Sequence, residues 1–167
     1  MPEQQTADKQ QTRTADERLQ ILKSTFPGWM EVETGLYPKI FETEADRLLD
    51  ECRRLRDELN FRYLSTISGV DRQDSFEVVY FIYNLEQRWQ LGLKVRLDHD
   101  LPEVDSVTEI WPAANWMERE TYDLLGIRFR NHPDLRRIYL NHSFQGYPLR
   151  KDFIDLRPKR NRRIRSR

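Results

Sequence analysis

Apolar residues recur at helical spacing in two segments near the N-terminus. Between residues 15 and 25, two leucines lie on one face of a short helix, which a proline–glycine pair brings to an end. Thr43, followed three residues later by Asp46, is typical of the N-cap of a second helix. That helix is predicted to reach residue 59, because its apolar positions keep the same spacing: Ala45, Leu48, Leu49, Cys52, Leu55 and Leu59.

Strand-like patterns replace the helical spacing in the middle of the chain. Three segments there are rich in β-branched and aromatic residues. The third, 89–97, alternates cleanly between apolar and polar or glycine residues, which predicts one buried face and one solvated face. Short polar connections between the three predict an antiparallel meander. With two shorter extended segments around a turn near Gly35, the predicted strands are 29–33, 39–42, 61–69, 76–85 and 89–97.

One more helix is predicted after a loop that Pro102 opens. Pro112 suits the first position of this helix, which runs to Leu125 and stops at Gly126, a residue type that favours a helix C-cap. The flanking segments are predicted to form a short helical turn at 105–111, extended chain at 127–130 and 136–140, and turns at 142–152.

The order of these elements indicates the fold class. Helices and strands are mixed but do not alternate as repeated βαβ units, and no internal repeat is visible. We therefore expect an α+β fold, with a small, mostly antiparallel sheet, helices on one face and an extended C-terminal segment. The length of 167 residues fits a single domain, 15–153. A disordered N-terminal tail, 1–14, and a basic C-terminal tail, 154–167, are expected beside it.

Charge is distributed unevenly, although the formal net charge of the whole chain is zero. Residues 150–167 hold nine Lys/Arg and two Asp, a net charge of +7, which leaves −7 on the rest. An acidic body with a basic end indicates that the end contacts an anionic group or another chain, or is simply solvated. No apolar run approaches the roughly 18 residues of a membrane span, and the N-terminus lacks the apolar stretch of a secretory signal.

The cysteine count bears on redox chemistry. Cys52 is the only cysteine, and the three histidines are scattered along the chain. An Fe–S cluster or a structural zinc site usually needs several thiolates at close spacing. We therefore expect no metal or redox cofactor on this chain, and any electron transfer belongs to a partner.

The helix that begins at Pro112 carries the most informative charged residues. By the i, i+3, i+4 rule, its core-facing stripe would contain Ala113, Trp116, Met117, Glu120 and Leu124. Glu120 would then need a partner, such as an arginine of the following segment or of another subunit. Arg119 and Asp123 would form a local pair in the less favourable order. An enzymatic alternative makes Glu120 a general acid–base beside His132, but no nucleophile or oxyanion device accompanies it.

A longer pattern extends from this helix. Glu118-Arg119-Glu120 is followed after two residues by Asp123 and Leu124-Leu125, then after six by His132, after three by Arg136, and after one by Ile138-Tyr139. Trp111-Pro112-Ala113-Ala114-Asn115-Trp116 precedes it, and Gly146-Tyr147-Pro148-Leu149-Arg150-Lys151-Asp152 follows it. The whole arrangement resembles the signature of the C-subunit family of complex I, densely from about residue 104 to 153. A pattern of this length with fixed gaps is highly specific.

The resemblance implies a subunit without a redox cofactor in the hydrophilic arm of a bacterial NADH–quinone oxidoreductase. Such a subunit docks to the quinone-pocket subunit and to the subunit with the terminal Fe–S cluster. The Fe–S clusters, FMN and quinone would all lie on partner subunits. The chain would sit at the cytoplasmic side of the inner membrane, contact the membrane only indirectly and bind no nucleic acid.

The same resemblance suggests where docking would occur. Segment 127–153 would be the partner-docking segment, in which Gly146 and Pro148 favour an extended course and Tyr147 offers an aromatic anchor. Arg150 and Lys151 would pair with charges on a partner. The candidate docking residues are Glu118, Arg119, Glu120, Asp123, His132, Arg136, Gly146, Pro148, Arg150, Lys151 and Asp152.

Two other functional classes stay open at this point. The same scaffold would serve as the equivalent subunit of a related membrane-bound [NiFe] hydrogenase or quinone oxidoreductase. A small RNA-binding α+β module with a basic tail is the second alternative, and it predicts exposed aromatic residues on a basic sheet face. The acidic body of the chain argues against that module.

Overall fold

The structure of the protein is a computed structural model that describes residues 14–35 and 37–155. Its helices and strands alternate irregularly along the chain. In chain order the elements are α1 (Ala15–Thr25), β1 (Met30–Val32), β2 (Ile40–Thr43), the 3-10 turn η1 (Ala45–Arg47), α2 (Leu48–Leu59), β3 (Tyr63–Asp71), β4 (Ser75–Asn84), β5 (Trp89–Asp98), β6 (Glu103–Asp105), α3 (Ala114–Leu125) and β7 (Arg128–Arg130).

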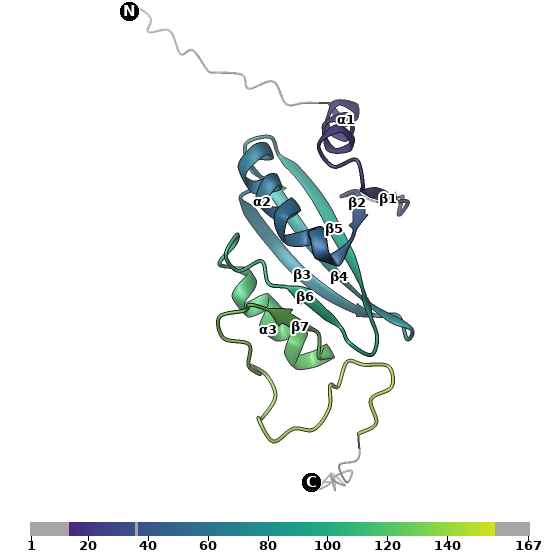
Figure 1. Ribbon diagram of the computed structural model, residues 1–167, viewed down its shortest axis with the longest axis vertical. Helices are drawn as coiled ribbons and strands as arrows, with labels where there is room; N and C mark the ends of the chain where they lie inside the picture. The colour runs from purple at the N-terminus through teal and green to yellow at the C-terminus, as the bar shows by residue number, and fades with distance from the viewer. Residues whose placement is uncertain (1–13, 36, 156–167) are drawn as a thin grey trace, which may run out of the picture.

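Five strands form the main sheet in the order β1-β2-β5-β4-β3 (Figure 1). β3, β4 and β5 form the predicted antiparallel meander, in which Tyr80 of β4 lies between Ile67 and Leu93 of its neighbours. β2 runs parallel to β5, with Phe41 beside Leu93. The sheet is therefore mixed but mostly antiparallel, and the predicted α+β class is confirmed.

One face of this sheet carries the hydrophobic core. Figure 1 shows α2 lying across the sheet, with α3 at the end nearer the C-terminus. The alternate residues of β5 from Trp89 to Leu97 are at most 5% exposed, as the period-two pattern predicts. Tyr80 is fully buried, and burial, followed by the charges of Glu118 on α3 and Cys52 on α2, raises its pKa. Both helices therefore lie close to the same residue of β4.

The N-terminal helix α1 has the predicted bounds. Thr14, which the sequence pattern assigns to the tail, is its N-cap: the Thr14 hydroxyl accepts a hydrogen bond from the Glu17 N–H, and the Glu17 carboxylate accepts one from the Thr14 N–H. The other residues of the predicted N-terminal tail, and residues 156–167 of the predicted basic tail, lie outside the described residues.

Two predicted helix starts are wrong. Thr43 is the last residue of β2, and its hydroxyl donates to the Glu51 carboxylate over 2.6 Å instead of accepting from the start of a helix. The chain then turns through η1 before α2 begins at Leu48. α3 begins at Ala114, two residues after Pro112. In both places a short turn precedes the helix, and local sequence preference does not distinguish such a turn from the first turn of the helix.

A second sheet joins two segments that the sequence treats separately. β6 and β7 pair in parallel, with Val104 beside Phe129. The prediction of extended chain at 127–130 is confirmed by β7. The segment predicted as a helical turn, 105–111, begins in β6, and only its later part turns, with the Trp111 N–H donating to the Val107 carbonyl. A three-residue strand is too short to leave a periodic pattern.

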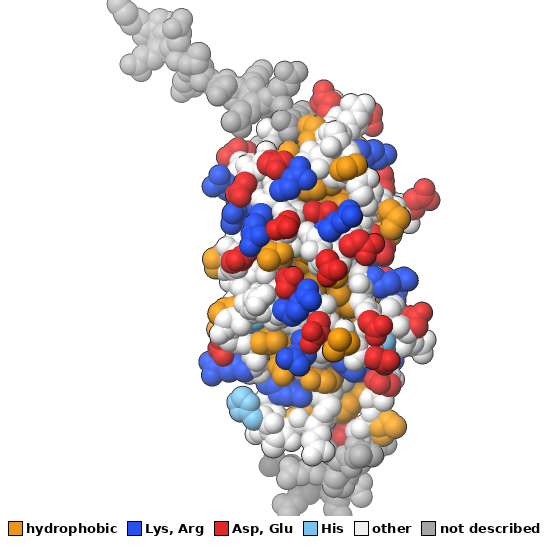
Figure 2. All heavy atoms as spheres, in the orientation of Figure 1, with side chains coloured by type: hydrophobic (Ala, Val, Ile, Leu, Met, Phe, Trp, Pro, Cys, Tyr) orange, Lys and Arg blue, Asp and Glu red, His pale blue; other side chains and the backbone are white. Residues whose placement is uncertain are grey.

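The surface mixes charges of both signs. Figure 2 shows Lys/Arg and Asp/Glu side chains interspersed over the face seen in Figure 1. On α2, outer residues pair along the helix, for example Arg54 with Glu58 at 2.8 Å. On the other face of the sheet, Glu77 lies between Lys94 and Arg72. Within residues 14–35 and 37–155, no helix has the length and apolar character needed to cross a membrane.

Candidate functional site

α3 turns a different side to the core from the one that its apolar spacing predicts. Its buried positions are Ala114, Glu118, Arg119, Thr121, Asp123 and Leu125. Glu120 is exposed, and Trp116 keeps 63% of its surface exposed. The predicted core-facing stripe was Ala113, Trp116, Met117, Glu120 and Leu124; of these only Met117 packs against the core, so the prediction is wrong for the rest. The buried charged residues find hydrogen-bond partners on distant segments, which a local pattern does not contain.

Glu118 lies at the centre of a buried polar cluster and has no exposed surface. Its Oε2 accepts a hydrogen bond from the Ser106 hydroxyl over 2.6 Å, and its Oε1 accepts one from the Val107 N–H over 2.8 Å. Burial raises the pKa of Glu118 to about 7, although both hydrogen bonds favour the charged form. Glu118 thereby connects α3 to the chain that follows β6.

His132 borders this cluster with a side chain that has no exposed surface. The Asp134 N–H donates to its Nδ1 over 3.0 Å, so Nε2 carries the proton and donates to the Asn115 carbonyl over 3.1 Å. Burial lowers the pKa of His132, which keeps the ring neutral. The Glu118 carboxylate lies 3.9 Å from Nε2, too far for a hydrogen bond.

Asp123 organises the segment that follows β7. Its Oδ2 accepts hydrogen bonds from the three consecutive N–H groups of residues 138–140, at 2.9, 2.7 and 3.0 Å. Its Oδ1 accepts from Arg137 over 2.9 Å. Burial favours the neutral acid, but these donors outweigh it and hold the pKa of Asp123 below its ordinary value. Because residues 138–140 bend around this carboxylate, the prediction of extended chain over 136–140 is wrong.

Arg119 and Asp123 do not form the local pair that their spacing suggests. The Arg119 Nε donates to the Arg136 carbonyl over 3.2 Å, and its guanidinium lies 4.7 Å from the ring centre of Trp116. The Arg136 side chain is 63% exposed and pairs with Asp134 at 2.9 Å. Arg119 therefore holds the backbone of the following segment, whereas Arg136 forms a surface ion pair.

Arg150 binds the C-terminal end of α3 and so holds its own segment against this helix. Its Nε donates to the Leu125 carbonyl over 2.6 Å. Its guanidinium lies 4.9 Å from the ring centre of Phe76 and 4.8 Å from that of Tyr147. A planar guanidinium between two aromatic rings, with one donor on a helix carbonyl, is a geometry that lysine cannot reproduce. Arg150 thus fastens the block around residues 146–152 to the helix and to β4.

The remaining residues of that block use mainly their backbone. The Lys151 N–H donates to the Asp71 carboxylate over 2.8 Å, while the Lys151 and Asp152 side chains are exposed. Gly146 has φ +85°, and its carbonyl accepts from Arg137 over 3.0 Å. Pro148 is half-buried.

The predicted signature residues therefore converge, but mostly on this chain's own backbone. Those that hold segment 131–153 or the chain after β6 against α3 are Glu118, Arg119, Asp123, His132, Gly146 and Arg150. Glu120, Lys151 and Asp152 expose their side chains. The carboxylate beside His132 is Glu118 and not Glu120, and that pair is sealed from solvent. The arrangement can fix backbone geometry, but it does not present an acid–base pair to a substrate.

Other residues that hold these segments together were not predicted from the sequence, or were only weakly indicated by it. Arg137 donates hydrogen bonds to both the carboxylate and the backbone carbonyl of Asp123. It is the unspecified residue of the signature between Arg136 and Ile138. Ser106 lies at the start of the region of resemblance but is not one of its marked positions, and Asp71 lies well before that region. No local spacing connects Ser106 with Glu118 or Asp71 with Lys151. Among the described residues, no group of three or more His, Cys, Asp or Glu side chains is arranged to hold a metal ion.

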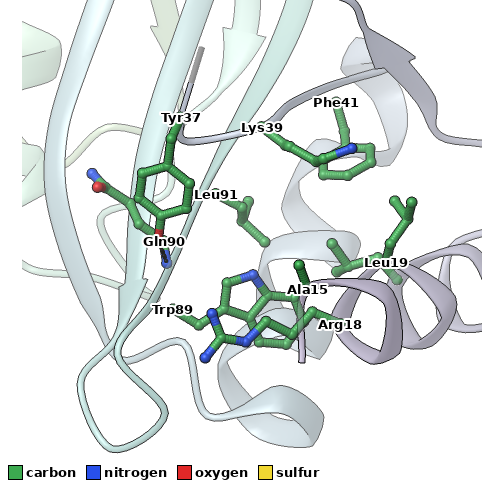
Figure 3. A pocket seen from close by; sticks show the side chains of 10 residues that line it. Ala15, Arg18, Leu19, Tyr37, Lys39, Phe41, Trp89, Gln90 and Leu91 are labelled. Atoms are coloured by element: carbon green, nitrogen blue, oxygen red, sulfur yellow. Dashed lines mark hydrogen bonds between the residues drawn. The ribbon is translucent and has the colours of Figure 1, made fainter. Parts of the chain in front are cut away.

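A small pocket lies away from the signature residues, between α1 and the strands β2 and β5 (Figure 3). Its volume is about 90 Å³, and Leu19, Phe41 and Leu91 give it an apolar lining. Arg18 lies over the Trp89 ring at 5.6 Å, and the Tyr37 hydroxyl accepts from the Gln90 N–H. The pocket is of the size of one apolar side chain, and no signature residue lines it.

Comparison with known proteins gives a family for the chain. Residues 41–159 match the family model described as "Respiratory-chain NADH dehydrogenase, 30 Kd subunit". Among curated relatives, the NADH-quinone oxidoreductase C 2 subunit of Rhizobium etli is 48% identical over 119 residues, 68% of this chain and 63% of the relative. The NADH-quinone oxidoreductase C subunit of Moorella thermoacetica is 39% identical over 140 residues, 83% of this chain and 94% of the relative. The matches to the relatives from Rhizobium etli and Rhizobium meliloti span 63% and 66% of those proteins.

Two solved structures share the fold. A trypsin-resistant fragment of Nqo5 superposes with a TM-score of 0.63 at 28% identity, over 72% of this chain and 98% of the fragment. A chain of the membrane-bound sulfane sulfur reductase, an archaeal respiratory membrane complex, superposes with a TM-score of 0.73 at 26% identity, over 84% of this chain and 86% of that chain.

Proposed function

The chain belongs to the family of the respiratory-chain NADH dehydrogenase 30 kDa subunit, and from this premise we propose that it is a non-redox structural subunit of a proton-translocating NADH–quinone oxidoreductase. It acts in the peripheral arm, where it docks to the quinone-pocket subunit and to the terminal Fe–S cluster subunit. The enzyme activity belongs to the whole assembly, and this chain contributes no catalytic site of its own.

One observation carries the proposal: the signature residues hold the C-terminal segment rigidly on α3. Asp123 accepts three consecutive backbone N–H groups, and Arg150 bonds the end of the helix. A segment held in this way keeps one conformation, so a partner that binds it need not order it first. Such a body suits a subunit that fixes the positions of its neighbours.

The redox groups are assigned to the partners: Fe–S clusters, FMN and quinone. Cys52, the one cysteine in the sequence, is fully buried in the core. Burial, followed by the nearby charge of Glu51, raises the pKa of the Cys52 thiol. A neutral, buried thiol is a poor metal ligand, because the thiolate is the form that binds.

The proposed location is the cytoplasmic side of the bacterial inner membrane, with the membrane contacted only through other subunits. No nucleic-acid partner is proposed. On the sheet face turned away from α2, Glu42 and Glu77 pair with Lys94, Arg72 and Arg96. Charges of both signs therefore share that face, which is not the uniformly basic surface that RNA binding needs.

A second candidate is the equivalent subunit of a related membrane-bound complex, of the [NiFe] hydrogenase or quinone oxidoreductase type. The likeness to the chain of the sulfane sulfur reductase complex favours it, because that likeness spans 84% of this chain. The higher identities to the C subunits of NADH-quinone oxidoreductases favour the first candidate.

Purification of the tagged chain from its own cells tests both candidates. We expect it to bring down a complex that contains Fe–S clusters and FMN and that reduces quinone with NADH. Deletion of the gene should abolish NADH-driven quinone reduction in membranes, and re-expression of the chain should restore it. A complex that forms and turns over normally without the chain would contradict the proposal, whereas a purified complex that does not oxidise NADH would favour the second candidate.

A further inference from the structure

α3 carries apolar residues on its solvent side as well as on its core side. Trp116 is 63% exposed, and Met117 and Leu124 are half-buried. By helical spacing these three share one face with Glu120, which is exposed. We refer to the surface of Trp116, Met117, Glu120 and Leu124 as the outer face of α3. Met117 packs in part against the hydrophobic core, but within the described chain the large apolar side chain of Trp116 faces solvent.

Two further exposed apolar side chains border this face. Tyr139 is 66% exposed, and its N–H is bound by Asp123 of α3. Leu149 is 59% exposed, and its N–H donates to the Leu124 carbonyl. Figure 2 shows apolar side chains exposed between charged ones over the part of the molecule where Figure 1 draws α3. The backbone contacts of the C-terminal segment therefore widen the apolar surface.

The Trp116 ring is held in place before any partner arrives. The Arg119 guanidinium lies 4.7 Å from its centre, and Arg119 is itself bonded to the Arg136 carbonyl. An exposed tryptophan that is already ordered loses little conformational freedom on binding, and tryptophan is the residue type most enriched at binding hot spots.

Glu120 is the acidic residue at the middle of the outer face. The arginines nearest in sequence have other partners: Arg119 bonds the Arg136 carbonyl, Arg136 pairs with Asp134, and Arg137 pairs with Asp123. Among the described residues, Glu120 forms no hydrogen bond or ion pair through its side chain. Within residues 14–35 and 37–155, no side-chain cation pairs with Glu120, so this carboxylate is available to a cation of a neighbouring molecule.

We propose that the outer face of α3 docks to a neighbouring subunit that presents an apolar surface and an Arg or Lys to pair with Glu120. This inference rests on the proposed function and names the face through which the chain is held. The negative charge of Glu120 argues against two other possible binding partners of this face. A twofold contact between two copies of the chain would bring Glu120 toward Glu120, and an anionic lipid surface would repel it.

Tagged variants of the full chain in the deletion strain test this inference. Glu120→Lys and Trp116→Ala should each reduce the amount of co-purifying subunits by about tenfold or more, because each removes a central contact. Leu101→Ala is the control, since Leu101 is 65% exposed but lies in the loop between β5 and β6 and not on the outer face of α3, and it should co-purify as the wild type does. The isolated Glu120→Lys variant should melt at the wild-type temperature, because Glu120 is exposed. The Trp116→Ala variant should melt only slightly lower, because it loses the contact with the Arg119 guanidinium.

The outcomes separate this inference from the proposed function. If the wild-type chain brings down no respiratory subunits, the proposed function fails. If it does, and both variants bring down the same amounts, the docking face is wrong while the proposed function stands. Concentration-dependent dimers that Trp116→Ala abolishes, or binding to phosphatidylglycerol vesicles that Trp116→Ala abolishes, would also overturn the inference.

Discussion

Gly126 lies directly against the ring of Tyr147. A Cβ on Gly126 would come within 2.5 Å of the Tyr147 Cε2, closer than real side chains approach. Gly126 also has φ +76°, which ends α3 in the left-handed conformation. One residue therefore both ends the helix and makes room for the returning chain.

This contact predicts a strong effect of Gly126→Ala. Left-handed backbone costs a non-glycine residue about 1–2 kcal/mol, and the clash with Tyr147 adds a further ~1–3 kcal/mol. Gly35→Ala is the control, because Gly35 has φ +65° with nothing within 4 Å of a Cβ, so it should show the backbone cost alone. Urea unfolding of both variants measures the difference, and equal losses of unfolding free energy would show that Tyr147 does not rest on Gly126.

A second prediction concerns the hydrogen bonds of Asp123. Asp123→Asn replaces an acceptor-only group with one that carries donors, and it leaves Arg137 without its anion. We expect a loss of about 3 kcal/mol of unfolding free energy. Amide hydrogen exchange should also become faster at residues 138–140, whose N–H groups the carboxylate holds. Asp134→Asn, which weakens the exposed pair with Arg136 and a longer contact with Arg119 at 3.8 Å, should cost less than about 1 kcal/mol and leave those amides protected.

A third prediction concerns the ionisation of Glu118. Its pKa of about 7 in the fold exceeds its ordinary value of 4.5, so the folded state binds the proton more tightly than the unfolded state. The stability contributed by this group is therefore fully present below pH 4.5 and is lost as the pH rises through 7.

Glu118→Gln makes this dependence measurable. At pH 4 the variant and the wild type should have similar unfolding free energies, because Glu118 is then mostly neutral in both the folded and the unfolded state. At pH 8 the variant should be more stable by about 3 kcal/mol, since glutamine does not ionise and the Ser106 hydroxyl can accept from its amide. Glu120→Gln serves as the exposed control and should follow the wild type at both pH values. A constant difference between Glu118→Gln and the wild type would refute the shift.

A fourth prediction separates the two adjacent cations that the sequence treats alike. Arg150→Lys should free the 146–152 block, because lysine loses both the planar contact with Phe76 and Tyr147 and the bond to the Leu125 carbonyl. Lys151→Ala should change little, since only the Lys151 backbone is engaged. The expected losses of unfolding free energy are about 2 kcal/mol and less than about 0.5 kcal/mol. Faster hydrogen exchange of the Leu149 amide in the first variant alone would support the assignment.

The elements with long periodic patterns were predictable from the chain alone. The alternation from Trp89 to Leu97 and the spacing from Leu48 to Leu59 each repeat over several turns or residue pairs, so one buried face follows from geometry. Gly126 was predictable as a helix end because few residues adopt positive φ without strain. The three-residue strands β6 and β7 form through pairing with each other, and neither has a pattern long enough to indicate its partner.

Within α3, the local pattern predicted the wrong side. Trp116 and Leu124 have the spacing of a core stripe, yet the helix buries Glu118 and Asp123 instead. A buried carboxylate is stable only when donors surround it, and these donors come from Ser106 and Val107 on one side and from residues 137–140 on the other.

The sequence alone established three things about this protein. They are the apolar periodicity of its long helices and strands, its family signature and its single cysteine. Folding decided which carboxylate is buried, which arginine holds the backbone and which apolar stripe remains exposed. The reason is physical: periodicity is a property of neighbouring residues, whereas the satisfaction of a buried charge depends on donors that only the folded chain brings within hydrogen-bond distance.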